Sequence, residues 1–172
     1  MVFGYRERRI MSTGVVIRDL LAVADVGAVW ANAGAGATRS VTGKRRGEMA
    51  EAKFLAKASE LGFGVAKPWG DSDAYDFIVQ TGGKLWKVQV KSAHVAWKDG
   101  SYSFRAHGHS YKAYRADEID LLVAYVVPEN AWYVFPVRVI QRMKSLKLFP
   151  GSRKKRSRFE KYREAWWILR RK

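Results

Sequence analysis

Apolar residues recur every three or four positions through residues 48–61, EMAEAKFLAKASEL. At about 100° per residue they fall on one stripe of a helix. The stripe consists of Phe54, Leu55, Ala58 and Leu61. Gly62 follows directly and is expected to end the helix in the left-handed conformation that glycine tolerates. The pattern therefore predicts a helix over residues 48–61.

Short apolar runs separated by turn residues predict a series of strands after this helix. The expected strands are 63–68, 76–80, 85–92, 101–106, 120–127 and 131–137. The Gly-Gly pair at 82–83 joins two of them into a hairpin. Residues 138–146 and 159–172 are expected to be helices. This order of elements predicts an α/β fold with helices packed on a central sheet.

The first part of the chain differs from the rest. Residues 1 to about 40 are rich in Ala, Gly and Val and have no clean periodicity. We expect residues 1–43 to be a poorly ordered N-terminal extension, or upstream sequence read through from an early start codon, and residues 44–172 to be the domain. Arg18, Asp19 and Asp25 interrupt the apolar stretch of this segment, which disfavours a secretory signal. For the same reason, the segment has no uninterrupted apolar run long enough to span a membrane.

Charge is the strongest global signal. The 172 residues include 32 Lys and Arg against 16 Asp and Glu, which gives a net charge of +16. Such an excess predicts an anionic partner, either nucleic acid or an anionic membrane surface. The chain has no cysteine, so disulfides and thiolate metal sites are excluded, and a reducing, cytoplasmic location is expected.

Four polar residues lie beside apolar positions of the predicted core. Glu51 lies close to the centre of the helical stripe, and Asp76 begins a strand. Gln89 and Lys91 share one face of the next strand, because side chains alternate. Each has an ordinary structural explanation: a helix-dipole contact for Glu51, a loop cap for Asp76 and a solvated strand face for the pair. The order of the four residues nevertheless places them where they can meet at one point.

That order resembles the PD-(D/E)XK nuclease superfamily. The similarity runs from GEMAEAKFLAKASELGFGV to YDFIVQTGGKLWKVQVKS, and is greatest to group I intron homing endonucleases with a Gln in the motif and to archaeal-type Holliday-junction resolvases. It implies a restriction-endonuclease-like core, with a central mixed β-sheet flanked by helices. Two positions depart from the family pattern. Tyr75 replaces the proline, and Gln89 stands where most members have a carboxylate.

The resemblance also implies roles for the four residues. Glu51, Asp76, Gln89 and Lys91 would form the catalytic set. Asp76, the amide oxygen of Gln89 and the carbonyl of Val90 would bind Mg²⁺, with Mn²⁺ as a substitute, and Glu51 would hold a water of that metal or a second metal. Lys91 would orient the attacking water or stabilise charge on the phosphate. The implied reaction is hydrolysis of a DNA phosphodiester.

Clusters of basic residues fit DNA as the partner. Lys44, Arg45 and Arg46 directly precede the predicted catalytic helix, and residues 153–172 contain ten Lys or Arg against two Glu. Arg153, Lys154, Lys155 and Arg156 form the densest run. Such groups neutralise phosphates and give affinity without reading sequence. A solvated flexible loop is the alternative for this run.

Two alternatives to an endonuclease remain at this point. One is a noncatalytic nucleic-acid-binding protein on the same fold, with Gln89 marking lost catalysis. The other is a basic RNA- or ribosome-associated protein in which the four-residue match arises by chance. His107 and His109 are expected on a substrate-facing loop and not at a zinc site. For the endonuclease, we expect a homodimer or higher homo-oligomer, location with the nucleoid and no membrane partner.

Overall fold

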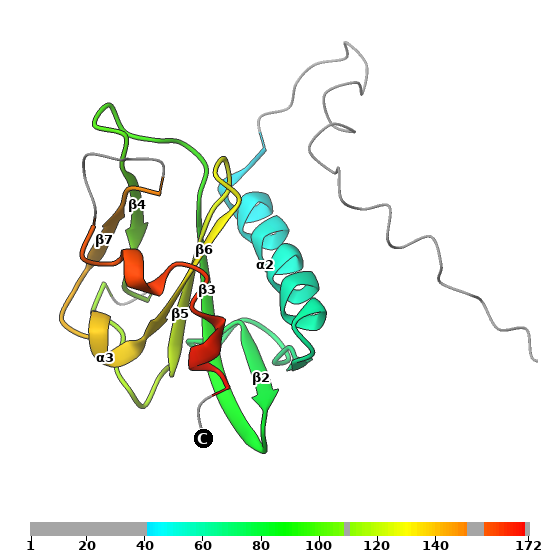
Figure 1. Cartoon of the computed structure of the whole chain (residues 1–172). Helices are drawn as coiled ribbons and strands as arrows, with labels where there is room; N and C mark the ends of the chain where they lie inside the picture. Colours follow the sequence, from blue (N-terminus) through cyan, green and yellow to red (C-terminus); the bar gives the residue numbers. More distant parts are fainter. Residues whose placement is uncertain (1–40, 109–110, 151–156, 171–172) are drawn as a thin grey trace, which may run out of the picture. The chain divides into compact units, whose positions relative to one another are not determined.

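A computed structural model of the protein describes residues 41–108, 111–150 and 157–170. In this part of the chain a five-stranded sheet, with strand order β1-β2-β3-β5-β6, is covered on both faces. Figure 1 shows helix α2 on one side of the sheet, and β4, β7 and α3 on the other. The sheet strands are β1 (Gly64–Ala66), β2 (Phe77–Thr81), β3 (Lys84–Ala93), β5 (Leu121–Val126) and β6 (Ala131–Pro136).

Helix α2 (Gly43–Glu60) begins five residues before the predicted start. The side chain of Thr42 caps it by accepting a hydrogen bond from the Arg45 N–H. Lys44, Arg45 and Arg46 therefore lie in the first turn of the helix and not in a loop before it. The described part of the chain also includes residues 41–43, which we expected in the extension.

The buried stripe of α2 differs from the predicted stripe. Ala50, Phe54 and Ala58 are buried at a spacing of four, whereas Leu55 is 44% exposed. Including Leu55 was wrong, because the helix rests on the sheet along the narrow i, i+4 row. Gly62 has φ +76, so the predicted left-handed end of the helix is confirmed.

The predicted hairpin is confirmed, and its turn explains its position. Gly82 and Gly83 have φ +52 and +81, and a two-residue hairpin turn with two positive φ angles strongly favours glycine. Strand β3 is antiparallel to β2 but parallel to β5. The sheet is therefore mixed, as predicted.

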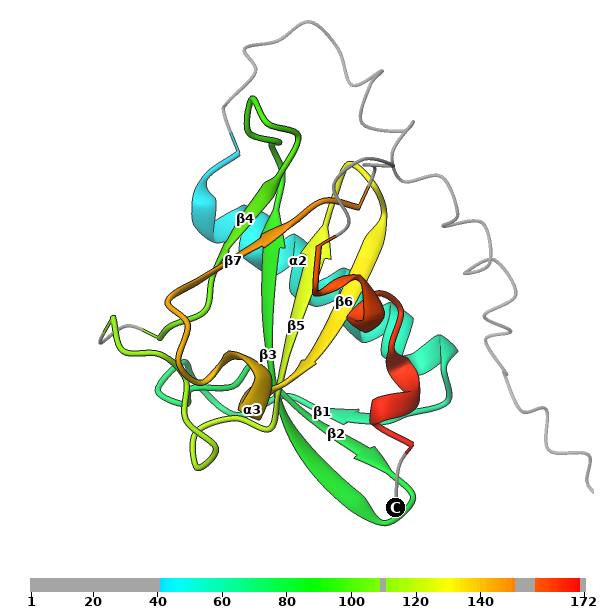
Figure 2. The same cartoon turned by 60° about the vertical axis from the view of Figure 1, so that its left-hand side comes forward.

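Strand β3 changes neighbour in its middle, at Val88. Before Val88 it pairs with β2, and from Val88 to its end it pairs with β5 on the other side. Figure 2 shows the β2–β3 hairpin extending below the rest of the sheet. One edge of the second half of β3 is consequently left without a neighbouring strand in the described sheet.

The second face of the sheet is covered by a small two-stranded sheet and a single helical turn. Strands β4 (Tyr102–Arg105) and β7 (Ser145–Leu148) pair antiparallel to each other. Helix α3 spans only Val137–Ile140. The predicted helix over 138–146 is wrong in its second half, because Leu146 and Leu148 alternate with exposed residues and pack as a strand.

The predicted helix over 159–172 is also wrong within the described residues. Two short 3₁₀ turns, Glu160–Tyr162 and Trp166–Ile168, replace it. Glu164 separates them at φ +48, and its carboxylate accepts hydrogen bonds from the Trp132 N–H and the Trp166 indole. These bonds tie the segment to β6. Trp166 is buried in the cluster that also contains Phe54 of α2, whereas Trp167 is half exposed.

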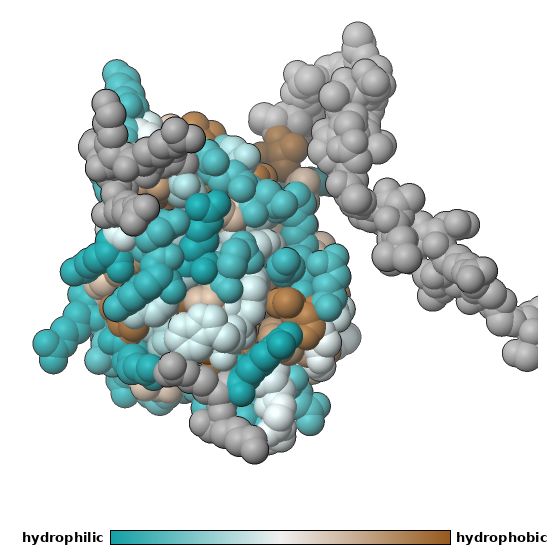
Figure 3. All heavy atoms as spheres, in the orientation of Figure 1, coloured by the Kyte–Doolittle hydropathy of each residue, from teal (hydrophilic) through white to brown (hydrophobic). Residues whose placement is uncertain are grey.

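The two faces of the sheet have separate hydrophobic clusters. One lies under α2 and includes Phe54, Val90 and Trp166, and the other lies under β4 and β7 and includes Tyr114 and Phe135. The face of the molecule in Figure 3 is mostly hydrophilic and carries only small, separated hydrophobic patches. Among the described residues, no helix combines the length and hydropathy needed to cross a membrane.

Candidate active site

The unpaired edge of β3 is the centre of the site. The Asp76 N–H donates to the Val88 carbonyl at 2.9 Å, as the last backbone contact between the two strands. After this contact no strand of the described sheet pairs with that edge of β3, and the Val90 N–H instead donates to the Asp76 carboxylate at 2.8 Å. The position of Asp76, directly before β2, is thus set by the end of the hydrogen-bond ladder between β2 and β3.

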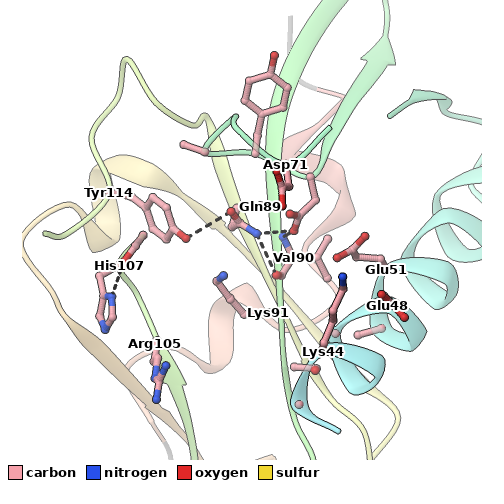
Figure 4. A pocket seen from close by; sticks show the side chains of 18 of the residues that line it. Lys44, Glu48, Glu51, Asp71, Gln89, Val90, Lys91, Arg105, His107 and Tyr114 are labelled. Atoms are coloured by element: carbon pink, nitrogen blue, oxygen red, sulfur yellow. Dashed lines mark hydrogen bonds between the residues drawn. The ribbon is translucent and has the colours of Figure 1, made fainter. Parts of the chain in front are cut away.

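Gln89 lies beside this carboxylate and is buried, with 7% of its surface exposed. Its Nε2 donates to Asp76 Oδ2 and to the Val90 carbonyl, the latter at 3.2 Å. Its Oε1 accepts the Tyr114 hydroxyl at 3.3 Å. The amide oxygen, which the sequence predicts as a metal ligand, therefore points to Tyr114, as Figure 4 shows.

Glu51 faces the same edge from α2. It is partly buried, and its Oε2 accepts a hydrogen bond of 2.7 Å from Lys67, which follows β1. The hydrogen bond to Glu51 raises the pKa of Lys67, and the charges of Asp76 and Glu48 add to this effect. In Figure 4 the Glu51 side chain extends from the helix towards Val90.

Lys91 lies on the same strand face as Gln89 and is half-buried. Burial lowers the pKa of its ammonium, and Arg105 lowers it further, while Asp76 and Glu51 act in the opposite direction. Burial likewise raises the pKa of the Asp76 carboxyl, with Glu51 adding to the rise, whereas the Val90 N–H, Lys91 and Lys67 oppose it. Perturbed groups of opposite charge inside a cleft are typical of functional sites.

All the residues of the predicted catalytic set line one cleft of about 1190 Å³. Its lining combines six Asp or Glu, namely Glu48, Glu51, Asp71, Asp73, Asp76 and Glu118, with six Lys or Arg. The cationic lining consists of Lys44, Arg46, Lys67, Lys91, Arg105 and Lys112, together with His94 and His107. Glu51 reaches the cleft from one face of the sheet, and Gln89 and Lys91 reach it from the other. The free edge of β3 therefore joins residues from both faces.

Comparison with known proteins places this site in a family. The sequence profile of the PD-(D/E)XK endonuclease family matches residues 41–169. The chain belongs to the PD-(D/E)XK endonuclease family. The resemblance carried by four residues is thus confirmed over most of the chain, and the alternative of a chance match is wrong. The predicted α/β fold, a restriction-endonuclease-like core, is confirmed as well.

Solved structures include relatives of this PD-(D/E)XK chain. The bacterial homing endonuclease I-Ssp6803I is 34% identical, with a TM-score of 0.65 over 74% of this chain and 91% of that chain. A Holliday junction resolvase, Hjc from the archaeal hyperthermophile Archaeoglobus fulgidus, is 19% identical, with a TM-score of 0.39 over 60% of this chain and 84% of that chain. No curated protein matches the sequence.

Three residues of this PD-(D/E)XK site were not predicted from the sequence. Tyr114 bonds Gln89, Lys67 bonds Glu51, and Arg105 acts on Lys91 through its charge. Tyr114 lies in a segment for which no element was predicted, and Lys67 lies near the end of the predicted strand 63–68, where a single lysine is not distinctive. Arg105 had a weak signal, because alternation in the predicted strand 101–106 turns it away from the buried Phe104.

Some of the other predicted residues lie outside the cleft lining or outside the described residues. Arg45 is exposed in α2 and is not among the cleft-lining residues, unlike Lys44 and Arg46. His107 lines the cleft, in agreement with a loop that faces substrate. Arg153, Lys154, Lys155, Arg156 and His109 lie outside the described residues.

The donor set of the site fits a hard divalent cation. Asp76 Oδ2 and the Val90 carbonyl oxygen both accept hydrogen bonds from Gln89 Nε2, so these two oxygen atoms point to the same place. Oxygen ligands of this kind suit Mg²⁺. No group of three or more His, Cys, Asp or Glu that would hold a metal occurs among the residues that the structure describes. Any cation here would therefore rely on one carboxylate with neutral oxygens beside it.

Proposed function

We propose that this protein is a Mg²⁺-dependent DNA endonuclease that hydrolyses phosphodiester bonds, either at a recognition site or at a branched junction. The observation that supports this most is the free edge of β3, where Asp76, Val90, Gln89 and Lys91 meet opposite Glu51 in one cleft. Membership in an endonuclease family and similarity to a homing endonuclease point to the same activity.

Each residue of the site has a distinct task in this proposal. Asp76 and the Val90 carbonyl hold the cation, and Glu51 faces it from the helix. When bound, Mg²⁺ polarises a phosphate oxygen and lowers the pKa of a water. Lys91, held half-buried beside Asp76, donates hydrogen bonds to the phosphate as negative charge develops on it. Lys44 and Arg46 neutralise phosphates on either side of the scissile bond.

Gln89 supplies an oxygen ligand only if its side-chain amide flips, so that Oε1 and Nε2 exchange the positions they have in the structure. Tyr114 accommodates both orientations, because a hydroxyl donates to an amide oxygen and accepts from an amide nitrogen. Burial and the nearby charge of Asp76 raise the pKa of Tyr114, so this hydroxyl keeps its proton at neutral pH. We therefore assign Tyr114 as the residue that positions Gln89.

One observation favours a second candidate, a protein that binds DNA without cutting it. The hydrogen bonds among Asp76, Gln89, Val90 and Tyr114 are complete without a metal. In addition, no buried side-chain polar atom of the described residues lacks a partner. A site that is satisfied in this way is what loss of metal binding would leave behind.

The deciding experiment incubates the purified full-length protein with supercoiled plasmid and with a four-way DNA junction, in Mg²⁺, Mn²⁺ or EDTA. We expect cleavage with either metal and none in EDTA. Asp76→Ala and Lys91→Ala should each lower the rate by at least about 10²-fold, the usual effect of losing one electrostatic contact to the transition state. Glu60→Ala removes an exposed carboxylate from the end of α2 and serves as the control.

The outcomes separate the two candidates. Cleavage that survives both active-site substitutions contradicts the assignment of the site. Binding without cleavage in any divalent metal favours the second candidate. In that case Gln89→Glu, which restores the usual carboxylate, should produce metal-dependent cleavage where the wild-type protein has none.

Assembly is a separate part of the proposal. An enzyme that cuts two DNA strands symmetrically is most simply a homodimer or a higher symmetric oligomer. Sedimentation of the full chain, with and without DNA, measures this state, and a monomer under both conditions contradicts it.

A further inference from the structure

Lys67 is held at the site by its backbone, and its side chain is exposed. It directly precedes Pro68, and a residue before proline is restricted to extended backbone. Its ammonium lies 5.8 Å from the centre of the Phe77 ring and 2.7 Å from Glu51 Oε2. The Lys67 side chain is 59% exposed and lines the cleft. The starting point of the side chain is therefore fixed, while its charged end is accessible to solvent and to substrate.

The ion pair with Glu51 is incompatible with a cation in the same place. Lys67 stands against a carboxylate that, in the proposed function, faces a divalent metal. A second positive charge at that carboxylate repels the ammonium and competes for its oxygen atoms. Exposed ion pairs are weak, so this one yields readily to a doubly charged ion.

When a cation displaces the Lys67 ammonium from Glu51, Lys67 remains in the cleft where the substrate would bind. The residue lines the same cleft as Asp76, Lys91 and Glu51. A phosphate drawn to the cation brings an anion to the place where Lys67 has lost its partner. Lysine suits such an exchange because its charge is a compact group on a flexible four-carbon chain, without the planar geometry that ties arginine to one carboxylate.

We propose that Lys67 is an exchangeable counter-ion of this active site. It neutralises Glu51 in the metal-free protein, and it passes to a DNA phosphate once a divalent cation has taken Glu51. This inference rests on the proposed function and adds a phosphate-binding residue to it. Lys67→Gln should therefore change metal affinity and DNA affinity in opposite directions.

The first test measures Mn²⁺ binding to the DNA-free protein by electron paramagnetic resonance. Lys67→Gln removes the competing ammonium, so we expect Mn²⁺ to bind about two- to fivefold more tightly, within the range that an exposed ion pair supports. In a Glu51→Gln background the same substitution should have no effect, because the interaction acts through that carboxylate. Lys44→Gln, which removes the same charge from the first turn of α2 in the same cleft, controls for general repulsion.

The second test measures binding of a short fluorescent duplex by anisotropy in EDTA and in Ca²⁺, a cation that takes oxygen ligands with looser geometry than Mg²⁺. In EDTA, where Lys67 pairs with Glu51, Lys67→Gln should leave the salt dependence unchanged and lower the affinity only as far as the uncompensated Glu51 carboxylate repels DNA. In Ca²⁺ it should weaken binding, and the slope of log affinity against log salt should fall by about 0.9, the value for one phosphate contact.

The possible results distinguish this inference from the proposed function. If the wild-type protein binds no Mn²⁺, the proposed function fails, and Lys67 has no metal to exchange with. If the wild-type protein binds Mn²⁺ but Lys67→Gln binds it equally well, the exchange is wrong. It is also wrong if Lys44→Gln strengthens Mn²⁺ binding as much as Lys67→Gln does, or if DNA affinity falls equally in EDTA and Ca²⁺.

Discussion

At the scale of the residue, the site keeps a carboxylate where burial opposes its charge. Asp76 is half-buried, and it is stabilised by the Val90 N–H and by Lys91. Burial still dominates and raises its pKa, so part of the folding free energy is given up to hold this charge in place. An arrangement of this kind is expected where a group is positioned for a ligand and not for stability.

Asp76→Asn should therefore stabilise the metal-free protein. Because its pKa is raised above the unfolded value of 3.8, Asp76 contributes most to stability below that value, and its contribution is lost as the pH rises through the folded pKa. At neutral pH in EDTA we expect the variant to melt about 2–4 °C higher, equivalent to about 1 kcal/mol in a chain of this size. The gain should vanish near pH 3.

Calorimetry against pH measures this difference. Asp71→Asn changes an exposed aspartate of the same cleft and should leave the melting temperature unchanged. A lower melting temperature for Asp76→Asn at neutral pH would contradict the prediction, since it would mean that the carboxylate stabilises the fold. Mg²⁺ should raise the melting temperature of the wild-type protein more than that of the variant.

At the scale of the element, one glycine inside helix α2 and one just after it have opposite requirements. Gly47 lies inside the helix, and a Cβ built there meets nothing within 4 Å. Gly62 follows the end of the helix at φ +76, where other residues are strained although space is available. The first glycine weakens the helix and the second ends it.

Substituting each glycine with alanine should shift stability in opposite directions. Gly47→Ala should raise the free energy of unfolding by about 0.8–1.0 kcal/mol through helix propensity. Gly62→Ala should lower it by about 1 kcal/mol because of its positive φ. Urea denaturation measures both, and a destabilised Gly47→Ala would show that a neighbour fills the space. Because Gly47 lines the cleft one turn before Glu51, the DNA affinity of the stabilised variant also tests whether a methyl group obstructs substrate.

At the scale of the whole molecule, charge and topology act together. The net charge of +16 attracts a polyanion in general, whereas the described lining of the cleft carries six Lys or Arg beside six Asp or Glu. The visible face in Figure 3 has no extended hydrophobic area that would suggest a membrane or a large apolar partner. In the proposed function, long-range attraction brings DNA to the protein, and the cleft selects where the DNA backbone binds.

Salt dependence should separate these two contributions. Arg46→Gln, on the wall of the cleft, should lower the slope of log DNA affinity against log salt by about 0.9, as expected for one lost phosphate contact. Lys57→Gln removes the same charge from α2 outside the cleft and should leave the slope unchanged. Anisotropy titrations at several salt concentrations measure both slopes, and equal changes would mean that the cleft has no special part in binding.

The sequence by itself determined the elements that depend on neighbouring residues. The helix over Phe54 and Ala58 follows from its periodicity, and the β2–β3 hairpin follows from Gly82 and Gly83. The order of Glu51, Asp76, Gln89 and Lys91 carried the resemblance to the family, and strand alternation placed Gln89 and Lys91 on one face. Local geometry was sufficient for the helix, the hairpin and this placement.

Only the tertiary structure decided how the site is completed. Tyr114 meets Gln89 from 25 positions away, and Lys67 meets Glu51 from 16 positions away. The C-terminal segment forms 3₁₀ turns because Glu164 bonds Trp132 on a distant strand, a contact that outweighs local helix propensity. These contacts depend on where the pairing of β3 with β2 ends and on how later segments pack against β3. No short stretch of sequence contains that information.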